Sequence, residues 1–170
     1  MVVFPEASMF AWDSSAEQLK AAASVGTEFI ERVSEIAVRE HLHVIAGVFA
    51  DVGDVRPRNR LIVVGPDGSL RGAYDKVHLF DAFSWRESDK VSPADTRGDL
   101  SELCTFVIDG FTVGLLNCYD LRFPEMGRAL VDRGAEVLAV SAAWVAGPLK
   151  EMHWNVLLRA RATLPDTLRR

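Results

Sequence analysis

Residues 114–125 read Gly114-Leu-Leu-Asn-Cys-Tyr-Asp-Leu-Arg-Phe-Pro-Glu125, and this segment says more about the fold than any other. The apolar run from Phe111 to Leu116 overlaps the start of this segment and predicts a buried strand that ends at Cys118. The Pro124-Glu125 pair is typical of a first helical turn. A strand that runs into a helix places the thiol beside backbone N–H groups and the helix dipole, which favour a thiolate. Cys118 is therefore a candidate nucleophile. The alternative is a buried, inert cysteine, which is the commoner environment of an isolated thiol.

Other apolar runs outside this segment also have the character of buried strands. The predicted strands cover residues 2–4, 44–50, 61–64, 70–74, 105–108, 111–116 and 137–140. Two pairs are joined by residues that favour tight turns, Gly-Pro-Asp-Gly-Ser at 65–69 and Asp109-Gly110, so we expect two hairpins.

Helical spacing of apolar residues occurs in three segments. Residues 19–38 predict one long amphipathic helix, with an interruption near Gly26 left open, and residues 122–133 and 149–162 predict two more. Residues 84–100 are rich in charged and turn-forming residues and predict a long loop, a feature that is often functional in compact domains. Strands mixed with helices predict an α/β layered fold, in a single domain over residues 1–170.

The composition argues against several classes of function. The chain has 170 residues, 49% of them hydrophobic, with a net charge of −5 and no large basic block, so nucleic acid and membrane surfaces are not expected as partners. Cys104 and Cys118 form no Cys-x-x-Cys motif, which argues against a thiol redox protein. The four histidines lack partners at metal-ligand spacing, so no metal is expected. Without a visible signal peptide or membrane span, the sequence predicts a cytoplasmic protein.

Two charged residues follow predicted strands. Glu6 comes directly after the first strand, and Lys76 follows the strand at 70–74. A carboxylate, an amine and a thiol at strand ends could converge on one edge of the fold. A carboxylate whose pKa is raised by burial could take the thiol proton, and the ammonium could stabilise a negative carbonyl oxygen. The alternatives are an exposed Glu6 and a surface ion pair at Lys76.

Together these segments resemble the nitrilase superfamily of carbon–nitrogen hydrolases. The matching segments are Val2-Val-Phe-Pro-Glu6, Asn59-Arg60, Tyr74-Asp-Lys-Val-His-Leu-Phe-Asp81, the Cys118 segment, and His153-Trp154 with Leu157-Leu-Arg-Ala-Arg-Ala162. The resemblance implies a four-layer α-β-β-α sandwich, of which this chain would hold a part. It also implies a homo-oligomer and no metal or organic cofactor.

The resemblance assigns catalytic roles to four residues. Cys118 would be the nucleophile, Glu6 the general base and Lys76 the group that stabilises the oxyanion. Glu87, within Trp-Arg-Glu-Ser, matches a second glutamate that many members of the family use. His78 is expected to help frame the strand that carries Lys76.

Three further residues are expected to contact the substrate. Tyr119 would supply a backbone N–H beside the thiol, and Ala143 and Trp144 follow a strand end and could line the pocket, with Trp144 as a core residue being the alternative. Three charged neighbours of the cysteine are expected to form ion pairs that orient the site: Asp120, Arg122 and Glu125.

The implied reaction is hydrolysis of a small linear carboxamide through a cysteine thioester, with release of ammonia and an acid, as in the small-amidase branches. Members of the superfamily are longer at both ends, so we expect a truncated chain. The alternative function is therefore a catalytically inactive remnant, or a binding subunit for a full-length relative.

Overall fold

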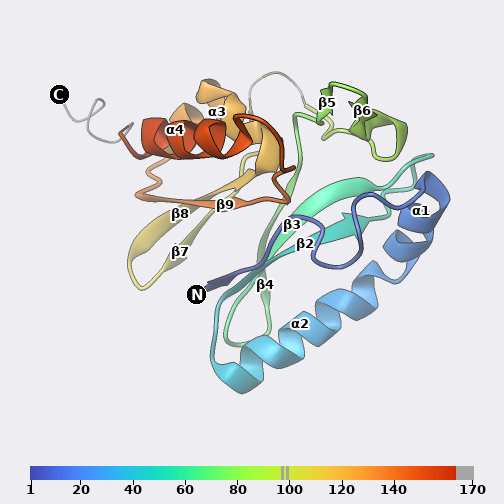
Figure 1. The fold of residues 1–170 in the computed structure, drawn as a ribbon. Coiled ribbons are helices and arrows are strands. Elements are labelled where there is room, and N and C mark those ends of the chain that lie inside the picture. The colour runs from blue at the N-terminus through green and yellow to red at the C-terminus, as the bar shows by residue number, and fades with distance from the viewer. Residues whose placement is uncertain (97, 99, 164–170) are drawn as a thin grey trace.

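Apolar runs build a four-stranded β-sheet in the computed structural model, which describes residues 1–96, 98 and 100–163 (Figure 1). The strand order is β1-β2-β3-β4, formed by Val2–Val3, Val44–Ala50, Arg58–Val64 and Leu70–Asp75. β1 pairs in parallel with β2, and the other pairs are antiparallel. The predicted hairpin between β3 and β4 is confirmed. Gly68 lies in its turn at φ +76°, a conformation that glycine adopts without strain.

The second sheet contains the cysteine strand. Its order is β7-β8-β9, with bounds Thr105–Ile108, Phe111–Asn117 and Val137–Ser141. β7 and β8 form the predicted hairpin through Asp109 and Gly110, which both have positive φ, as a two-residue hairpin turn of this kind requires. β8 and β9 are parallel, and α3 (Pro124–Asp132) connects them.

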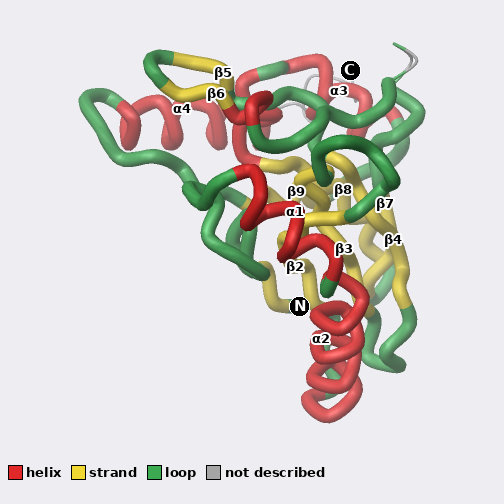
Figure 2. Tube along the Cα trace, turned by 90° about the vertical axis from the view of Figure 1, so that its right-hand side faces the viewer, coloured by secondary structure: helices red, strands yellow, loops and turns green. Residues whose placement is uncertain are grey.

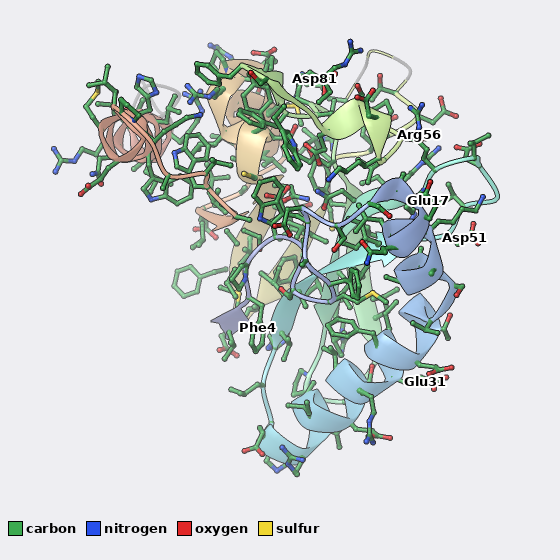
Figure 3. The ribbon with its side chains drawn as sticks, turned by 45° about the vertical axis from the view of Figure 1, so that its right-hand side comes forward. Phe4, Glu17, Glu31, Asp51, Arg56 and Asp81 are labelled. Atoms are coloured by element: carbon green, nitrogen blue, oxygen red, sulfur yellow. The ribbon has the colours of Figure 1, made fainter. Side chains whose placement is uncertain are left out.

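Helices cover the outer face of each sheet. α1 (Ala16–Ser24) and α2 (Gly26–Glu40) lie on the first sheet, and α3 and α4 (Lys150–Ala162) lie on the side of the second (Figures 1 and 2). Acidic side chains such as Glu17 and Glu31 project from α1 and α2 into solvent (Figure 3). The predicted helix over 19–38 is interrupted, because α1 ends before Val25. At Gly26 an added Cβ would lie 3.1 Å from the Phe49 carbonyl oxygen, so the break allows close packing on β2.

The two faces of the first sheet bury different neighbours. Val44, Ala46 and Val48 pack with α2, whereas the intervening Ile45 packs in the core between the sheets. The cluster that contains Ile45 includes buried residues of both sheets and continues to α3 on the far side of β8, with members Leu61, Val63, Tyr74, Phe106, Val113, Leu115, Met126 and Leu130. The layers are therefore α-β-β-α, as the sequence predicts.

Two predicted segments differ in detail. The loop at 84–100 holds structure of its own: β6 (Trp85–Arg86) pairs with β5 (Asp81–Ala82), and a 3₁₀ turn spans Glu87–Asp89. The helix predicted from residue 122 begins at Pro124, because Cys118–Arg122 form a separate 3₁₀ turn. Residues 164–170, at the predicted truncation, lie outside the described part of the chain. Among the described helices, none is long and apolar enough to cross a membrane.

Candidate active site

The fold brings together the four residues predicted to be catalytic. Glu6 follows β1, Lys76 follows β4, Glu87 opens the 3₁₀ turn after β6, and Cys118 follows β8. The Lys76 Nζ lies 2.7 Å from Glu6 Oε1 and 2.7 Å from Glu87 Oε2. The exposed fractions of the Lys76, Glu6 and Glu87 side chains are only 2%, 7% and 14%, so these charges meet in an environment with little water. Cys118 is buried beside them.

A pair of asparagines completes this cluster. The Asn59 amide donates to Glu6 Oε1 at 2.8 Å and to Glu87 Oε1 at 2.9 Å, so it joins the two carboxylates. It shares the Glu6 oxygen with Lys76 and takes the Glu87 oxygen that the lysine does not contact. Asn117 donates to Asn59 Oδ1 at 3.1 Å. The sequence analysis gave neither asparagine a role. A signal was present for Asn117, which ends a largely apolar strand, but Asn59 lies between Arg58 and Arg60 and its burial is visible only in the structure.

The electrostatics correct two expectations from sequence. Burial alone would raise the pKa of Glu6, but the Lys76 charge and hydrogen bonds from Lys76, Cys118 and the Ala143 N–H outweigh it and lower that pKa. Burial and the nearby Glu6 charge raise the pKa of Cys118, although Lys76 opposes them. Burial disfavours the Lys76 ammonium, yet the Glu6 and Glu87 charges raise its pKa. The resting site therefore holds a thiol, a carboxylate and an ammonium, rather than a thiolate and a protonated acid.

The backbone at Cys118 also differs from the predicted helix N-terminus. Cys118 has φ +49°, in the left-handed region that residues other than glycine rarely adopt, and it opens the 3₁₀ turn instead of α3. Strained backbone of this kind persists where surrounding contacts hold it, which is common at functional sites. The sharp turn directs the thiol toward Glu6 and Lys76.

Asp120 provides one of the contacts that hold this turn. It is fully buried and accepts hydrogen bonds from the Tyr74 hydroxyl at 2.7 Å, the His78 N–H at 2.8 Å and the His78 Nδ1 at 2.9 Å. The His78 ring stacks on Phe123 with centroids 3.5 Å apart. Because Tyr74 and His78 flank Lys76 in sequence, Asp120 ties the lysine segment to the cysteine turn. The framing role expected of His78 and the orienting role expected of Asp120 agree with these contacts.

A pocket opens onto this cluster. Tyr119, Ala143 and Trp144 line it, and lining was the place expected of Ala143 and Trp144. The Ala143 N–H donates to Glu6 Oε2 at 3.1 Å, so this residue acts through its backbone. The Trp144 indole donates to the Lys150 carbonyl at 2.9 Å and packs on Trp154, so Trp144 is both a pocket wall and a packing residue.

The arrangement suits acyl transfer to sulfur. A thiol lies beside a carboxylate that can accept its proton and an ammonium that can stabilise an oxyanion. Within residues 1–96, 98 and 100–163, no group of three or more His, Cys, Asp or Glu side chains is arranged to hold a metal ion.

The sequence model of one family, carbon–nitrogen hydrolase, matches residues 1–163. The chain belongs to the carbon–nitrogen hydrolase family. Its fold agrees with solved members: an amidase of the nitrilase superfamily from Nesterenkonia superposes with a TM-score of 0.73 at 26% identity, covering 95% of this chain and 58% of that one. A carbon–nitrogen hydrolase from Helicobacter pylori G27 superposes with a TM-score of 0.79 at 22% identity, covering 94% of this chain and 55% of that one.

Several relatives of this carbon–nitrogen hydrolase chain are named as hydrolases or amidases. Hydrolase MT0498 of Mycobacterium tuberculosis is 41% identical over 164 residues, which are 95% of this chain and 56% of that protein. A deaminated glutathione amidase of Escherichia coli O157:H7 is 38% identical over 163 residues, 95% of this chain and 60% of its own length. The human omega-amidase is 32% identical over 148 residues, which are 83% of this chain and 50% of that protein. The chain thus spans between half and three fifths of these relatives.

Proposed function

We propose that this chain hydrolyses the C–N bond of a small linear carboxamide through a thioester at Cys118. The observation that carries the proposal is the buried Glu6–Lys76–Glu87 cluster beside the Cys118 thiol, at one pocket. Because the pKa of Glu6 is lowered and that of Cys118 is raised, the resting charges are those that a base and a protonated nucleophile require before substrate binds.

The first half of the reaction forms the thioester. Glu6 accepts the thiol proton as Sγ attacks the amide carbon, and the carbonyl oxygen becomes an oxyanion that the Lys76 ammonium stabilises. The Tyr119 N–H, next to the nucleophile, is the second proposed donor to this oxyanion. Glu6 then gives its proton to the leaving nitrogen, the C–N bond breaks, and ammonia departs.

The second half releases the acid. Glu6 takes a proton from water, which attacks the thioester carbon, and the tetrahedral intermediate collapses with return of the proton to sulfur. Glu87 holds the lysine and Asn59 holds the Glu6 carboxylate in place during both halves, and a hydrogen bond joins Asn59 to Glu87. Metal and cofactor take no part in the proposed steps.

Ammonia release from a panel of small amides tests the proposal. We expect Cys118→Ala to abolish turnover, and Cys104→Ala to retain it, because Cys104 lies outside the pocket and serves as the matched cysteine control. Intact-mass analysis after acid quench should show an acyl adduct on the wild type that Cys118→Ala lacks. Turnover that survives Cys118→Ala would contradict the thioester mechanism.

A binding subunit for a related chain is the second candidate function. It is favoured by large apolar side chains that are exposed on the second sheet and on α4, where Val107, Phe111 and Val156 are 64%, 56% and 55% exposed. A well-folded chain with no amide turnover would support this candidate. The homo-oligomer and the cytoplasmic location remain predictions from sequence, and light scattering of the purified chain tests the first.

A further inference from the structure

The reacting groups of the proposed site come from different sheets. Glu6 and Lys76 follow β1 and β4 of the first sheet, whereas Cys118 follows β8 of the second. Proton transfer requires the thiol and its base to lie within hydrogen-bond distance, so the ends of the two sheets must be held in a fixed relation. Polar contacts that cross between the sheets at this end can therefore set the distances that the reaction needs.

One such contact joins Asn117, the last residue of β8, to Asn59 in β3. The Asn117 amide donates to Asn59 Oδ1 at 3.1 Å, and the Asn59 amide donates in turn to the Glu6 and Glu87 carboxylates. The exposed fractions of Asn117 and Asn59 are 0% and 3%, so water does not compete for these hydrogen bonds. The residue directly before the nucleophile is thus connected to both carboxylates through one side chain.

The two carboxylates fix the direction of each hydrogen bond. Ionised Glu6 and Glu87 can only accept, so the NH₂ group of Asn59 must face them and its carbonyl oxygen must face away. That oxygen needs a donor, and among the described residues the NH₂ group of Asn117 supplies it. A leucine of similar size at position 117 would leave the Asn59 oxygen without a donor.

The other end of the Asn117 side chain indicates that stability does not explain this residue. Asn117 Oδ1 is buried and has no hydrogen-bond partner among the described residues. A buried acceptor without a donor destabilises a fold, and an apolar side chain at position 117 would avoid that loss. The residue after Asn117 is Cys118, whose backbone has φ +49°. An amide that is unfavourable for folding, placed next to the nucleophile, agrees with a role in the reaction.

We propose that Asn117 is a positioning residue, which acts through Asn59 to hold the Glu6 and Glu87 carboxylates in register with the Cys118 thiol. This inference rests on the proposed amidase function. The role differs from that of Asp120, which binds the lysine segment to the turn after the cysteine. Asn117 instead connects the strand before the cysteine to the carboxylates.

A double-mutant cycle in kcat tests the proposal, with propionamide as the substrate. Asn117→Leu should lower kcat by about 10- to 100-fold and change KM little, since displacement of reacting groups by about 1 Å has effects of this size. Asn59→Leu should lower kcat at least as much, and the double variant should be no slower than Asn59→Leu alone. Asn155→Leu changes an exposed asparagine on α4 outside the pocket, and this control should keep the wild-type kcat. Effects of the two single substitutions that multiply in the double variant would overturn the proposal.

Urea titration distinguishes positioning from a general loss of folding. Asn117→Leu exchanges one buried acceptor without a partner, Asn117 Oδ1, for another, Asn59 Oδ1, so the urea midpoint should change little. A fall in kcat that is accompanied by a large fall in the midpoint would give Asn117 a structural role instead.

Alkylation of Cys118 by iodoacetamide separates this inference from the proposed function, because it needs no amide turnover. All variants carry Cys104→Ala, so that the intact mass reports Cys118 alone. Asn117→Leu should slow alkylation by about 10-fold, because the thiol is no longer aligned with its base, and the double variant should react at the rate of Asn59→Leu. A rate that is unchanged or higher in Asn117→Leu would overturn the positioning role even if amides are hydrolysed. The expected rates without any amide turnover would support the positioning role and contradict the amidase function.

Discussion

Glu6 and Asp120 are both buried carboxylates that accept hydrogen bonds from the segment at the end of β4, but their donors differ. Glu6 accepts a hydrogen bond from the Lys76 ammonium and lines the pocket. Asp120 accepts hydrogen bonds from the Tyr74 hydroxyl and the His78 N–H, and it is not among the residues that line the pocket. We call the first group, Glu6, Lys76, Glu87 and Asn59, the charged cluster. The second group, Asp120, Tyr74 and His78, is the clamp.

The difference separates chemistry from positioning. In the proposed mechanism the charged cluster exchanges protons with a substrate, which agrees with its place at the pocket. The clamp is closed off, and its carboxylate fixes two chain segments through groups that stay bound throughout a turnover. Since Lys76 lies between Tyr74 and His78 in sequence, the clamp determines where the ammonium of the charged cluster lies.

The largest expected effect comes from removing the cation of the charged cluster. Lys76→Met leaves two carboxylates in a site with little water, and breaking a buried ion pair in this way typically costs about 3–5 kcal/mol of unfolding free energy. Urea titration at pH 7 measures it. The matched control is Arg32→Met, which removes an exposed ion pair with Glu35 and should cost about 0.5 kcal/mol or less.

Lowering the pH should reduce the loss of unfolding free energy in Lys76→Met, because protonation neutralises the two carboxylates that have lost their cation. A deficit that stays constant from pH 7 to pH 4 would indicate that lost packing, rather than uncompensated charge, is responsible.

Breaking the clamp should have a smaller effect on stability and a distinct kinetic signature. Asp120→Asn loses at least one of three hydrogen bonds at a fully buried position, which typically costs about 1–3 kcal/mol. Displacement of the reacting groups by about 1 Å can lower kcat on the order of 100-fold. We expect kcat to fall and KM to change little, as measured by ammonia release. Asp67→Asn, an exposed aspartate in the β3–β4 turn, is the control. A change confined to KM would mean that Asp120 acts on substrate binding instead.

The smallest expected effect is a difference in how the two groups respond to pH. The lowered pKa of Glu6 contributes stability above its ordinary value of 4.5, and this contribution is lost as the pH falls through the folded-state pKa. Burial first, and then the Asp120 charge, raise the pKa of Tyr74 well above its ordinary 10.0. Its contribution is therefore present below pH 10 and is lost as the pH rises further.

Urea midpoints measured from pH 3 to 11 test this contrast. Tyr74→Phe should lower stability at pH 7 by about 1 kcal/mol and should make the alkaline decline less steep, while Lys76 still contributes to that decline. Glu6→Gln should flatten the acid side, and it should also reduce the Lys76 contribution on the alkaline side, because the Glu6 charge helps to raise the lysine pKa. If Tyr74→Phe altered the acid side instead, the assignment of the two pH ranges would be wrong.

Periodicity was sufficient to predict most of the framework. The strand at 44–50 and both hairpins are present, because apolar runs and turn residues act locally. The order of the motifs was sufficient to place Glu6, Lys76 and Cys118 together. The positive φ of Cys118 was not predictable, since it depends on contacts with Asp120 and neighbouring strands. The charge state of Glu6 was not predictable either, because its pKa depends on Lys76, which lies 70 residues away in the sequence. Arg122 was assigned an ion pair, but its guanidinium lies 5.0 Å from an indole ring, because sequence does not show which neighbours of a charge are aromatic.

The hydrogen bond from Ala143 to Glu6 joins residues 137 positions apart, and the Ser141 hydroxyl closes a span of the same length by donating to the Phe4 carbonyl. Contacts this distant in sequence form slowly, because the entropy of closing a long loop is lost before the contacts contribute any stability. A growing polypeptide on the ribosome therefore keeps its thiol and carboxylate unassembled until the segment after β9 has emerged. Recovery of catalysis after dilution from denaturant would accordingly report the final stage of folding, later than the recovery of helical circular dichroism.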